Sequence, residues 1–167
     1  MPKRITQCPI ARSLERVGDE WSVLILRDAL YGLTRFDEFQ KSLGIAPNIL
    51  TKRLAALTES GMLERRQYSE HPPRYEYHLT EAGRDFRTVI LAMLAWGNRH
   101  FAEGGLATVL VNTKTGDIAD PVLVDRKNGR PLVGPDYRIM PGPAANEVMR
   151  KRYETLPANS SFTESPK

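Results

Sequence analysis

The feature that most constrains the fold of this chain is a tight turn, Gly44-Ile45-Ala46-Pro47, between two segments with helical patterns. Gly44 is a typical helix stop, and Pro47 is suited to the first position of the next helix. We therefore expect helices over residues 35–43 and 47–60, joined as in a helix-turn-helix. The first of them carries an apolar side made of Phe36, Phe39 and Leu43.

The second helix has two unlike sides when its residues are placed about 100° apart. One side carries three leucines that would face a core, and the opposite side carries small or polar groups that could enter the groove of a duplex. These sets are Leu50, Leu54 and Leu57 on the first side, and Asn48, Thr51, Lys52 and Ala55 on the second. No acidic residue occurs between Pro47 and Thr58, so the second side would not repel phosphate. Taken alone, the segment also fits an ordinary amphipathic helix with a solvated face.

A hairpin pattern follows this helix directly. We expect strands over residues 62–68 and 74–79, with the turn at 69–73 interrupting both strands because its prolines remove ladder donors. The basic residues of the hairpin are Arg65, Arg66 and Arg74. A helix, a tight turn, a helix and a basic hairpin in this order favour DNA binding, with a recognition helix in the major groove and a wing beside it.

The segments on either side complete an α+β fold. The patterns predict helices over residues 8–17 and 20–31, the second with Asp19 as its N-cap, and a long helix over 81–101 capped by Thr80. This long helix carries more apolar surface than one small domain needs, which indicates that a partner covers part of it.

In these residues the chain resembles the HxlR-type branch of winged helix-turn-helix regulators, which is related to the MarR type. The match runs in order and without large gaps over about residues 8–103. The matching residues are Cys8-Pro9-Ile10, Leu14, Val17-Gly18, Trp21, Ile25-Leu26-Arg27, Arg35-Phe36, Glu38, Leu43-Gly44-Ile45, Leu50-Thr51-Lys52-Arg53-Leu54, Gly61, Leu63, Pro73, Tyr75 to Thr80, Gly83 and Trp96-Gly97. Ala46 departs from the pattern, because many relatives have a serine N-cap there, and losing such a cap costs about 0.5–2 kcal/mol.

The resemblance implies a bacterial transcription regulator, a repressor that occupies a promoter, bound to double-stranded DNA at a pseudo-palindromic operator. We expect Asn48, Thr51 and Lys52 to read or approach bases, and Arg53, Arg65, Arg66 and Arg74 to contact phosphate mainly. Arg53 lies on the flank of its helix, so bracing the fold is an alternative role for it. A protein–protein interaction module of the same fold is the alternative function, and it would need a neutral or acidic recognition surface.

The resemblance also implies a homodimer in which the first and last helices of two subunits pack together. The expected dimerisation residues are Ile10, Leu14, Val89, Met93, Trp96 and Phe101. The alternative is that some of these side chains close the core of their own subunit.

Cys8 is the single cysteine, and it precedes Pro9 at the start of the first helix. A helix dipole and nearby cations favour a thiolate, and some relatives with a cysteine here are redox sensors, so a switch through Cys8 stands beside the alternative of a small buried side chain. The sequence offers no signature of an enzyme, a metal site or a cofactor: its three histidines have no ligand spacing, and it has no phosphate-binding glycine loop. A small-molecule effector remains an open partner.

The chain beyond the long helix has a different composition, which is rich in Val, Leu, Gly and Pro. We expect strands over residues 106–112, 121–125, 131–133 and 137–140, and a helix over 144–153. Glycine turns at Thr115-Gly116 and Asn128-Gly129 sit where some longer relatives have a zinc ribbon, but Asp125 and Asn128 stand in place of its cysteines, so we expect a metal-free remnant. The expected domains are 1–104, a β-rich appendage over 105–156 and a disordered tail over 157–167.

Length and composition fit this organisation. The 167 residues, with 41% hydrophobic and 26% charged residues and a net charge of +4, suit a globular protein that could bind nucleic acid. No apolar run approaches the roughly 20 residues of a membrane span, and the first residues lack a signal-peptide pattern, so we expect a cytoplasmic protein.

Overall fold

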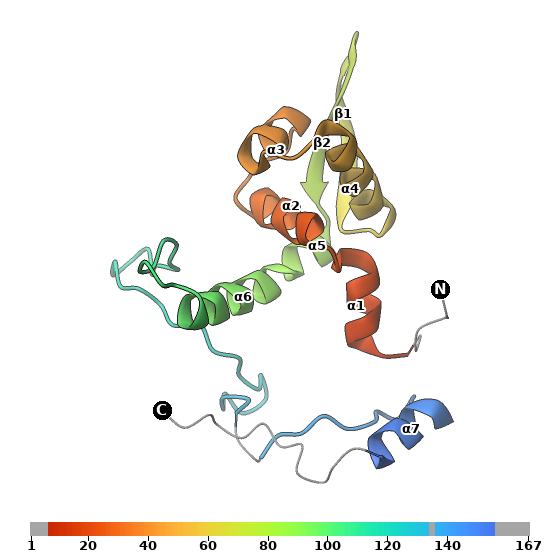
Figure 1. The fold of residues 1–167 in the computed structure, drawn as a ribbon, viewed down its shortest axis with the longest axis vertical. Coiled ribbons are helices and arrows are strands. Elements are labelled where there is room, and N and C mark those ends of the chain that lie inside the picture. Colours follow the sequence, from red (N-terminus) through yellow and green to blue (C-terminus); the bar gives the residue numbers. More distant parts are fainter. Residues whose placement is uncertain (1–6, 134–135, 156–167) are drawn as a thin grey trace. The chain divides into compact units, whose positions relative to one another are not determined.

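The computed structural model describes residues 7–133 and 136–155, and the chain divides into two compact units. One unit consists of residues 13–120, and the other consists of residues 1–12 and 121–167. The expected disordered tail, 157–167, lies outside the described residues. The elements of the chain are α1 (Pro9–Val17), α2 (Glu20–Leu30), α3 (Phe36–Leu43), α4 (Pro47–Glu59), β1 (Leu63–Glu70), β2 (Pro73–Leu79), α5 (Glu81–Asp85), α6 (Arg87–His100) and α7 (Glu147–Glu154) (Figure 1).

The helix-turn-helix formed by α3 and α4 is confirmed. Gly44 ends α3 in the left-handed region, with a φ of 60°, and Ala46 precedes Pro47 without a side-chain hydrogen bond to α4. The start of α3 is held differently, because the Glu38 carboxylate accepts hydrogen bonds from the backbone N–H groups of Thr34 and Arg35, each at 2.9 Å. These bonds lower the pKa of Glu38, since they stabilise its charged form.

The core of this unit lies where α2, α3 and α4 pack together over the base of the hairpin. The three leucines of α4, Leu50, Leu54 and Leu57, are completely buried, as predicted from their spacing. They pack in one cluster with side chains of α2 and α3, among them Ile25, Leu26 and Phe39. At the start of α2, Asp19 caps the helix by accepting a hydrogen bond from the backbone N–H of Ser22 at 2.9 Å.

The hairpin is longer than predicted. β1 and β2 pair antiparallel, with Glu70 opposite Pro73, and an irregularity of register lies between Gln67 and Ser69. The prediction that the prolines would interrupt both strands was wrong for Pro73, which is the first residue of β2. A proline is tolerated at the first position of a strand, because the ladder does not need its missing donor there.

The single long helix predicted over residues 81–101 is divided into α5 and α6 at Phe86. Phe86 keeps a right-handed backbone with a ψ of −14°, which tightens the turn, and its side chain packs on the core of the unit. Thr80 caps α5 as predicted, by accepting a hydrogen bond from the backbone N–H of Gly83 at 3.1 Å.

Beyond α6 the predicted strands are reduced to isolated bridges, Val111 with Ile118 and Val124 with Pro131, among the residues that the structure describes. Two turns occur as predicted, with Gly116 and Gly129 in the left-handed region. The prolines of this stretch lack backbone N–H donors, which limits the ladders that it can form. The predicted C-terminal helix is present as α7. No helix within the described ranges has the length and apolar character that a membrane span requires.

The close approach of α5 to the start of the hairpin gives a test of the packing. A Cβ added at Gly83 would collide with the backbone carbonyl oxygen of Met62, and neither backbone can yield cheaply. We expect Gly83→Ala to lower the free energy of unfolding by about 1–3 kcal/mol in a denaturant titration. Gly104→Ala is the control, because its Cβ would meet no atom within 4 Å, and it should stay within about 0.5 kcal/mol of the parent. Equal stability of the two variants would contradict the close packing of α5.

Candidate nucleic-acid interface

The outward side of α4 is open to solvent. Asn48, Thr51, Lys52 and Ala55 are all exposed, opposite the three buried leucines. The Thr51 hydroxyl donates a hydrogen bond to the Pro47 carbonyl oxygen at 2.8 Å, and the Asn48 side-chain oxygen accepts one from the Ile49 N–H at 3.0 Å. Both polar side chains are therefore held close to the first turn of the helix, where a recognition helix approaches base edges.

Arg53 lies on the flank of α4 and is paired with the cap of α2. Its Nε lies 3.1 Å from Asp19 Oδ1, and the two side chains are 38% and 29% exposed. Asp19 also accepts the Ser22 hydroxyl at 2.6 Å, so one carboxylate holds the start of α2 and a side chain of α4. The bracing contact considered for Arg53 is therefore present, and it leaves part of the guanidinium exposed.

The hairpin carries its arginines on a ribbon that projects beyond α3 and α4 (Figure 1). Arg65 lies over the ring of Tyr75, with 4.3 Å between the guanidinium carbon and the ring centroid. Arg66 is paired with Glu64 on the same strand, and Arg74 is exposed near the far end of β2. Because α4 packs directly on β1, these cations belong to the same structural unit as the outward side of α4.

Sequence reasoning gave no role to Arg35, which ties α3 to the wing. Its Nε lies 3.1 Å from Glu76 Oε1 on β2, and its guanidinium lies 4.9 Å from the Tyr68 ring centroid. The hydrogen bond to Glu76 and the interaction with Tyr68 raise the pKa of Arg35. The Tyr77 N–H also donates to the Thr34 carbonyl oxygen at 2.7 Å. An arginine just before a helix carries no sequence signal for such a contact, because its partner is 41 residues away.

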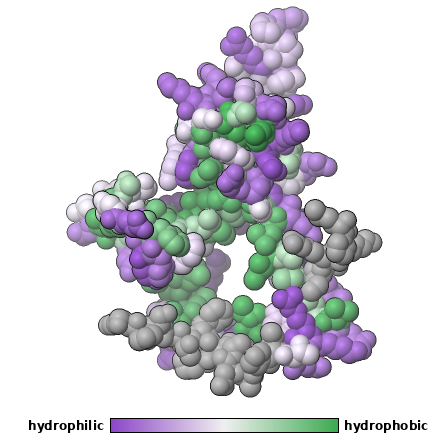
Figure 2. All heavy atoms as spheres, in the orientation of Figure 1, coloured by the Kyte–Doolittle hydropathy of each residue, from purple (hydrophilic) through white to green (hydrophobic). Residues whose placement is uncertain are grey.

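The apolar residues expected at a dimer interface are exposed in the single chain. The exposed fractions are 45% for Val89, 47% for Met93, 56% for Trp96, 65% for Phe101, 64% for Ile10 and 54% for Leu14. No residue of α6 is buried, and Figure 2 shows hydrophobic residues gathered along this helix. Trp96 and Phe101 pack edge to face, with ring centroids 4.9 Å apart. Cys8, just before α1, is a free thiol of intermediate exposure.

Proteins similar to this chain in sequence are named as HTH-type transcriptional regulators. An HTH-type transcriptional regulator of Mycobacterium tuberculosis is 38% identical over 135 residues, which are 80% of this chain and 85% of the relative. The regulator YdeP of Bacillus subtilis is 37% identical over 94 residues, 56% of this chain and 73% of that protein.

Solved structures agree with these relatives. A putative transcription factor from Pseudomonas aeruginosa is 53% identical and superimposes with a TM-score of 0.64, covering 87% of this chain and 99% of its own. The redox regulator HypR in its reduced form is 33% identical, with a TM-score of 0.53, over 58% of this chain and 99% of its own. The model of the HxlR-like helix-turn-helix family matches residues 16–104. The chain therefore belongs to the HxlR-like helix-turn-helix family of transcriptional regulators.

Proposed function

We propose that this regulator binds a pseudo-palindromic operator as a homodimer and represses transcription by occupying a promoter. The observation that carries the proposal is the outward side of α4, which is exposed, carries no acidic residue from Pro47 to Thr58 and is adjacent to a wing rich in arginine. A surface of this kind can approach phosphate without repulsion and still present polar groups to base edges.

Within this proposal, the outward side of α4 reads the major groove. Lys52 is a cation that makes no ion pair with the described residues, and it can donate to the acceptors of guanine. Asn48, one turn nearer the start of the helix, and Thr51, the residue before Lys52, offer further hydrogen-bonding groups. The small side chain of Ala55 would let the helix approach the floor of the groove closely.

In this proposal the phosphates are contacted by one arginine on the flank of α4 and three on the wing. These residues are Arg53, Arg65, Arg66 and Arg74. Arg53 would be oriented for this role by Asp19, which occupies its Nε and leaves other N–H groups for an anion. Arg65 and Arg66 are held by Tyr75 and Glu64, whereas Arg74 lies nearest the tip. Such contacts position the protein on the duplex and set the salt dependence of binding.

The exposed apolar residues of α6, together with Ile10 and Leu14 of α1, support the proposed homodimer. α6 packs on α2 but has no fully buried side chain, and a second copy would bury the side formed by Val89, Met93 and Trp96. Two recognition helices must lie roughly 34 Å apart to read one face of B-DNA, and a two-fold axis at these helices would supply that relation.

Two alternatives to this proposal are a protein–protein interaction module and redox control through Cys8. A protein–protein interaction module is disfavoured, because the outward side of α4 presents Lys52 and lies beside the arginines of the wing. Redox control through Cys8 is a second candidate, since the thiol lies at the start of α1 and a structural relative is a redox regulator. Oxidation there would act on the first helix of the proposed interface. We propose that the appendage over residues 105–156 is a metal-free remnant of a zinc ribbon, because Asp125 and Asn128 stand where its cysteines would be.

Residues that read bases and residues that contact phosphate should lose DNA affinity in different ways when they are replaced. Lys52→Ala should relax sequence preference: the binding free energy should fall by about 1–3 kcal/mol on specific DNA and by less on scrambled DNA. Arg74→Ala should weaken binding to specific and to scrambled DNA similarly, and it should reduce the slope of log affinity against log salt concentration by about 1. Fluorescence anisotropy at several salt concentrations measures both effects, and Lys114→Ala, an exposed cation outside the proposed surface, is the control. Parental behaviour of both variants would remove α4 and the wing from the interface.

The pairing of Arg53 with Asp19 predicts a coupled effect. Asp19→Asn keeps an acceptor for the cap of α2 but removes the charge that orients Arg53, so DNA affinity should fall about threefold to tenfold. Arg53→Ala should lower the salt slope by about 1, and adding Asp19→Asn to it should cost little more. If Arg53→Ala lowers stability while the salt slope is unchanged, Arg53 serves only as a brace.

The homodimer predicts the effect of a charge on α6. Met93→Glu should raise the dimer dissociation constant by on the order of a hundredfold, because a carboxylate would be buried without a partner. Arg87→Glu places the same charge on an exposed site on the opposite side of this helix and is the control. Sedimentation velocity over a concentration series measures the change. A monomeric parent protein, or a Met93→Glu variant that dimerises normally, would contradict this interface.

A further inference from the structure

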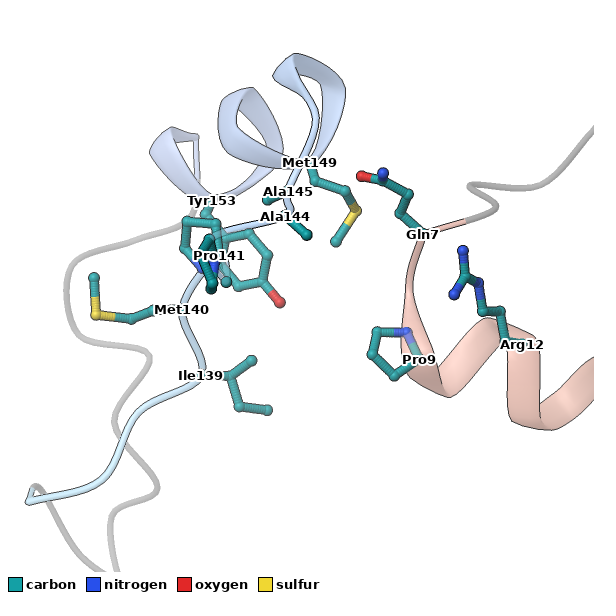
Figure 3. Close-up of a pocket in the computed structure, with 12 residues that line it drawn as sticks. Gln7, Pro9, Arg12, Ile139, Met140, Pro141, Ala144, Ala145, Met149 and Tyr153 are labelled. Atoms are coloured by element: carbon teal, nitrogen blue, oxygen red, sulfur yellow. The ribbon is translucent and has the colours of Figure 1, made fainter. Parts of the chain in front are cut away.

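Two features of the described chain have no part in the proposed contacts with DNA. One is a half-open pocket of about 360 Å³ between the start of α1 and α7 (Figure 3). Arg12, the one charged side chain among its described lining residues, already interacts within the chain, so we assign no ligand to this pocket. The other feature is the joint between α3 and the wing, which is centred on Arg35 and Glu76.

The backbone before α3 pairs with the edge of β2 in this joint. The Tyr77 N–H donates to the Thr34 carbonyl oxygen at 2.7 Å, and Arg35 forms an isolated antiparallel bridge with Glu76. Thr34 and Arg35 also donate their N–H groups to the Glu38 carboxylate of α3. A two-stranded ribbon is marginally stable by itself, so the direction of the wing depends on contacts of this kind with the helices.

The side chain of Arg35 contacts both strands of the wing. Its Nε lies 3.1 Å from Glu76 Oε1 on β2, and its guanidinium carbon lies 4.9 Å from the centroid of the Tyr68 ring on β1. The other carboxylate oxygen of Glu76 lies 3.2 Å from His78 Nε2. A planar guanidinium can pair through its edge and stack through its face at the same time, so one side chain fixes β1 and β2 relative to α3.

The charge of Glu76 is unexpected on a surface that meets phosphate. It lies opposite Arg66 in the hairpin, but Arg66 pairs with Glu64 instead. A carboxylate beside a duplex repels the phosphates, so its removal should strengthen DNA binding if charge alone mattered. The contact with Arg35 gives this carboxylate a different use.

We propose that Arg35 and Glu76 are positioning residues of the DNA interface. Together they hold the wing in the direction from which its arginines reach phosphate, and neither of them contacts the duplex. This inference rests on the proposed function, because it assigns the joint a role in binding DNA.

The sign of one substitution separates positioning from charge. The probe is a fluorescent duplex that the parent protein has selected from a random library, and anisotropy measures its affinity. Glu76→Gln should weaken binding about threefold to fivefold, the range that a partly exposed ion pair can contribute, although it removes a negative charge. Glu70→Gln is the matched control, because it removes the same charge from an exposed position of the hairpin that makes no ion pair with the described residues. It should bind at least as tightly as the parent.

A double-variant cycle tests whether Arg35 acts through the wing. Arg35→Gln should cost less affinity when Arg74→Ala has already removed a wing contact, and its full cost should remain in the presence of Lys52→Ala on α4. A direct contact of Arg35 with phosphate would give the same cost in all three backgrounds, and Glu76→Gln would then strengthen binding.

Hydrogen exchange measures the joint without DNA. The Tyr77 amide should exchange faster in Glu76→Gln than in the parent, because its acceptor Thr34 lies outside the hairpin, while the amides of the β1–β2 ladder keep their protection. The inference alone is overturned if Glu76→Gln binds as tightly as Glu70→Gln, if Arg35→Gln has the same cost in every background, or if Tyr77 exchange is unchanged. A parent protein that selects no duplex would overturn the proposed function and this inference together.

Discussion

Burial of the leucine side of α4 is the constraint on which the other features of this protein depend. Leu50, Leu54 and Leu57 lose all contact with solvent in the cluster with α2 and α3, and each buried side chain of this size contributes about 1.5–3 kcal/mol. Because the helix cannot rotate without exposing them, the opposite side must face outward. The same packing thus sets stability and decides which residues can meet a duplex.

Electrostatic contacts then fix the parts of the surface relative to one another. Asp19 joins the start of α2 to the flank of α4, and Arg35 joins the start of α3 to β2. Both pairs are partly exposed, so each contributes little to overall stability. In the proposed complex with DNA their importance is positional, since a recognition helix and a wing must keep a fixed relation to contact adjacent grooves.

The sequence was sufficient for the elements whose signals are local. The stop at Gly44, the start at Pro47, the caps at Asp19 and Thr80 and the leucine spacing of α4 depend on neighbours within one or two turns. The tightened turn at Phe86 was not predictable, because it coincides with packing of Phe86 on a core that the helical pattern does not describe. Pro73 was misjudged because its position at the start of a strand depends on where the partner strand ends. The contacts of Arg35 with Glu76 and of Arg53 with Asp19 join residues far apart in sequence, so no spacing rule could reveal them.

The absence of any buried side chain on α6 has a consequence for how such a regulator responds to its own abundance. A helix of 14 residues is marginal in water by itself, and α6 is supported within its own subunit only by partly buried contacts with α2. In the homodimer that we propose, full ordering of this helix would be a bimolecular event, and at low abundance the concentration of the dimer would follow the square of the subunit concentration. The amount of active protein would then change more steeply than the amount synthesised.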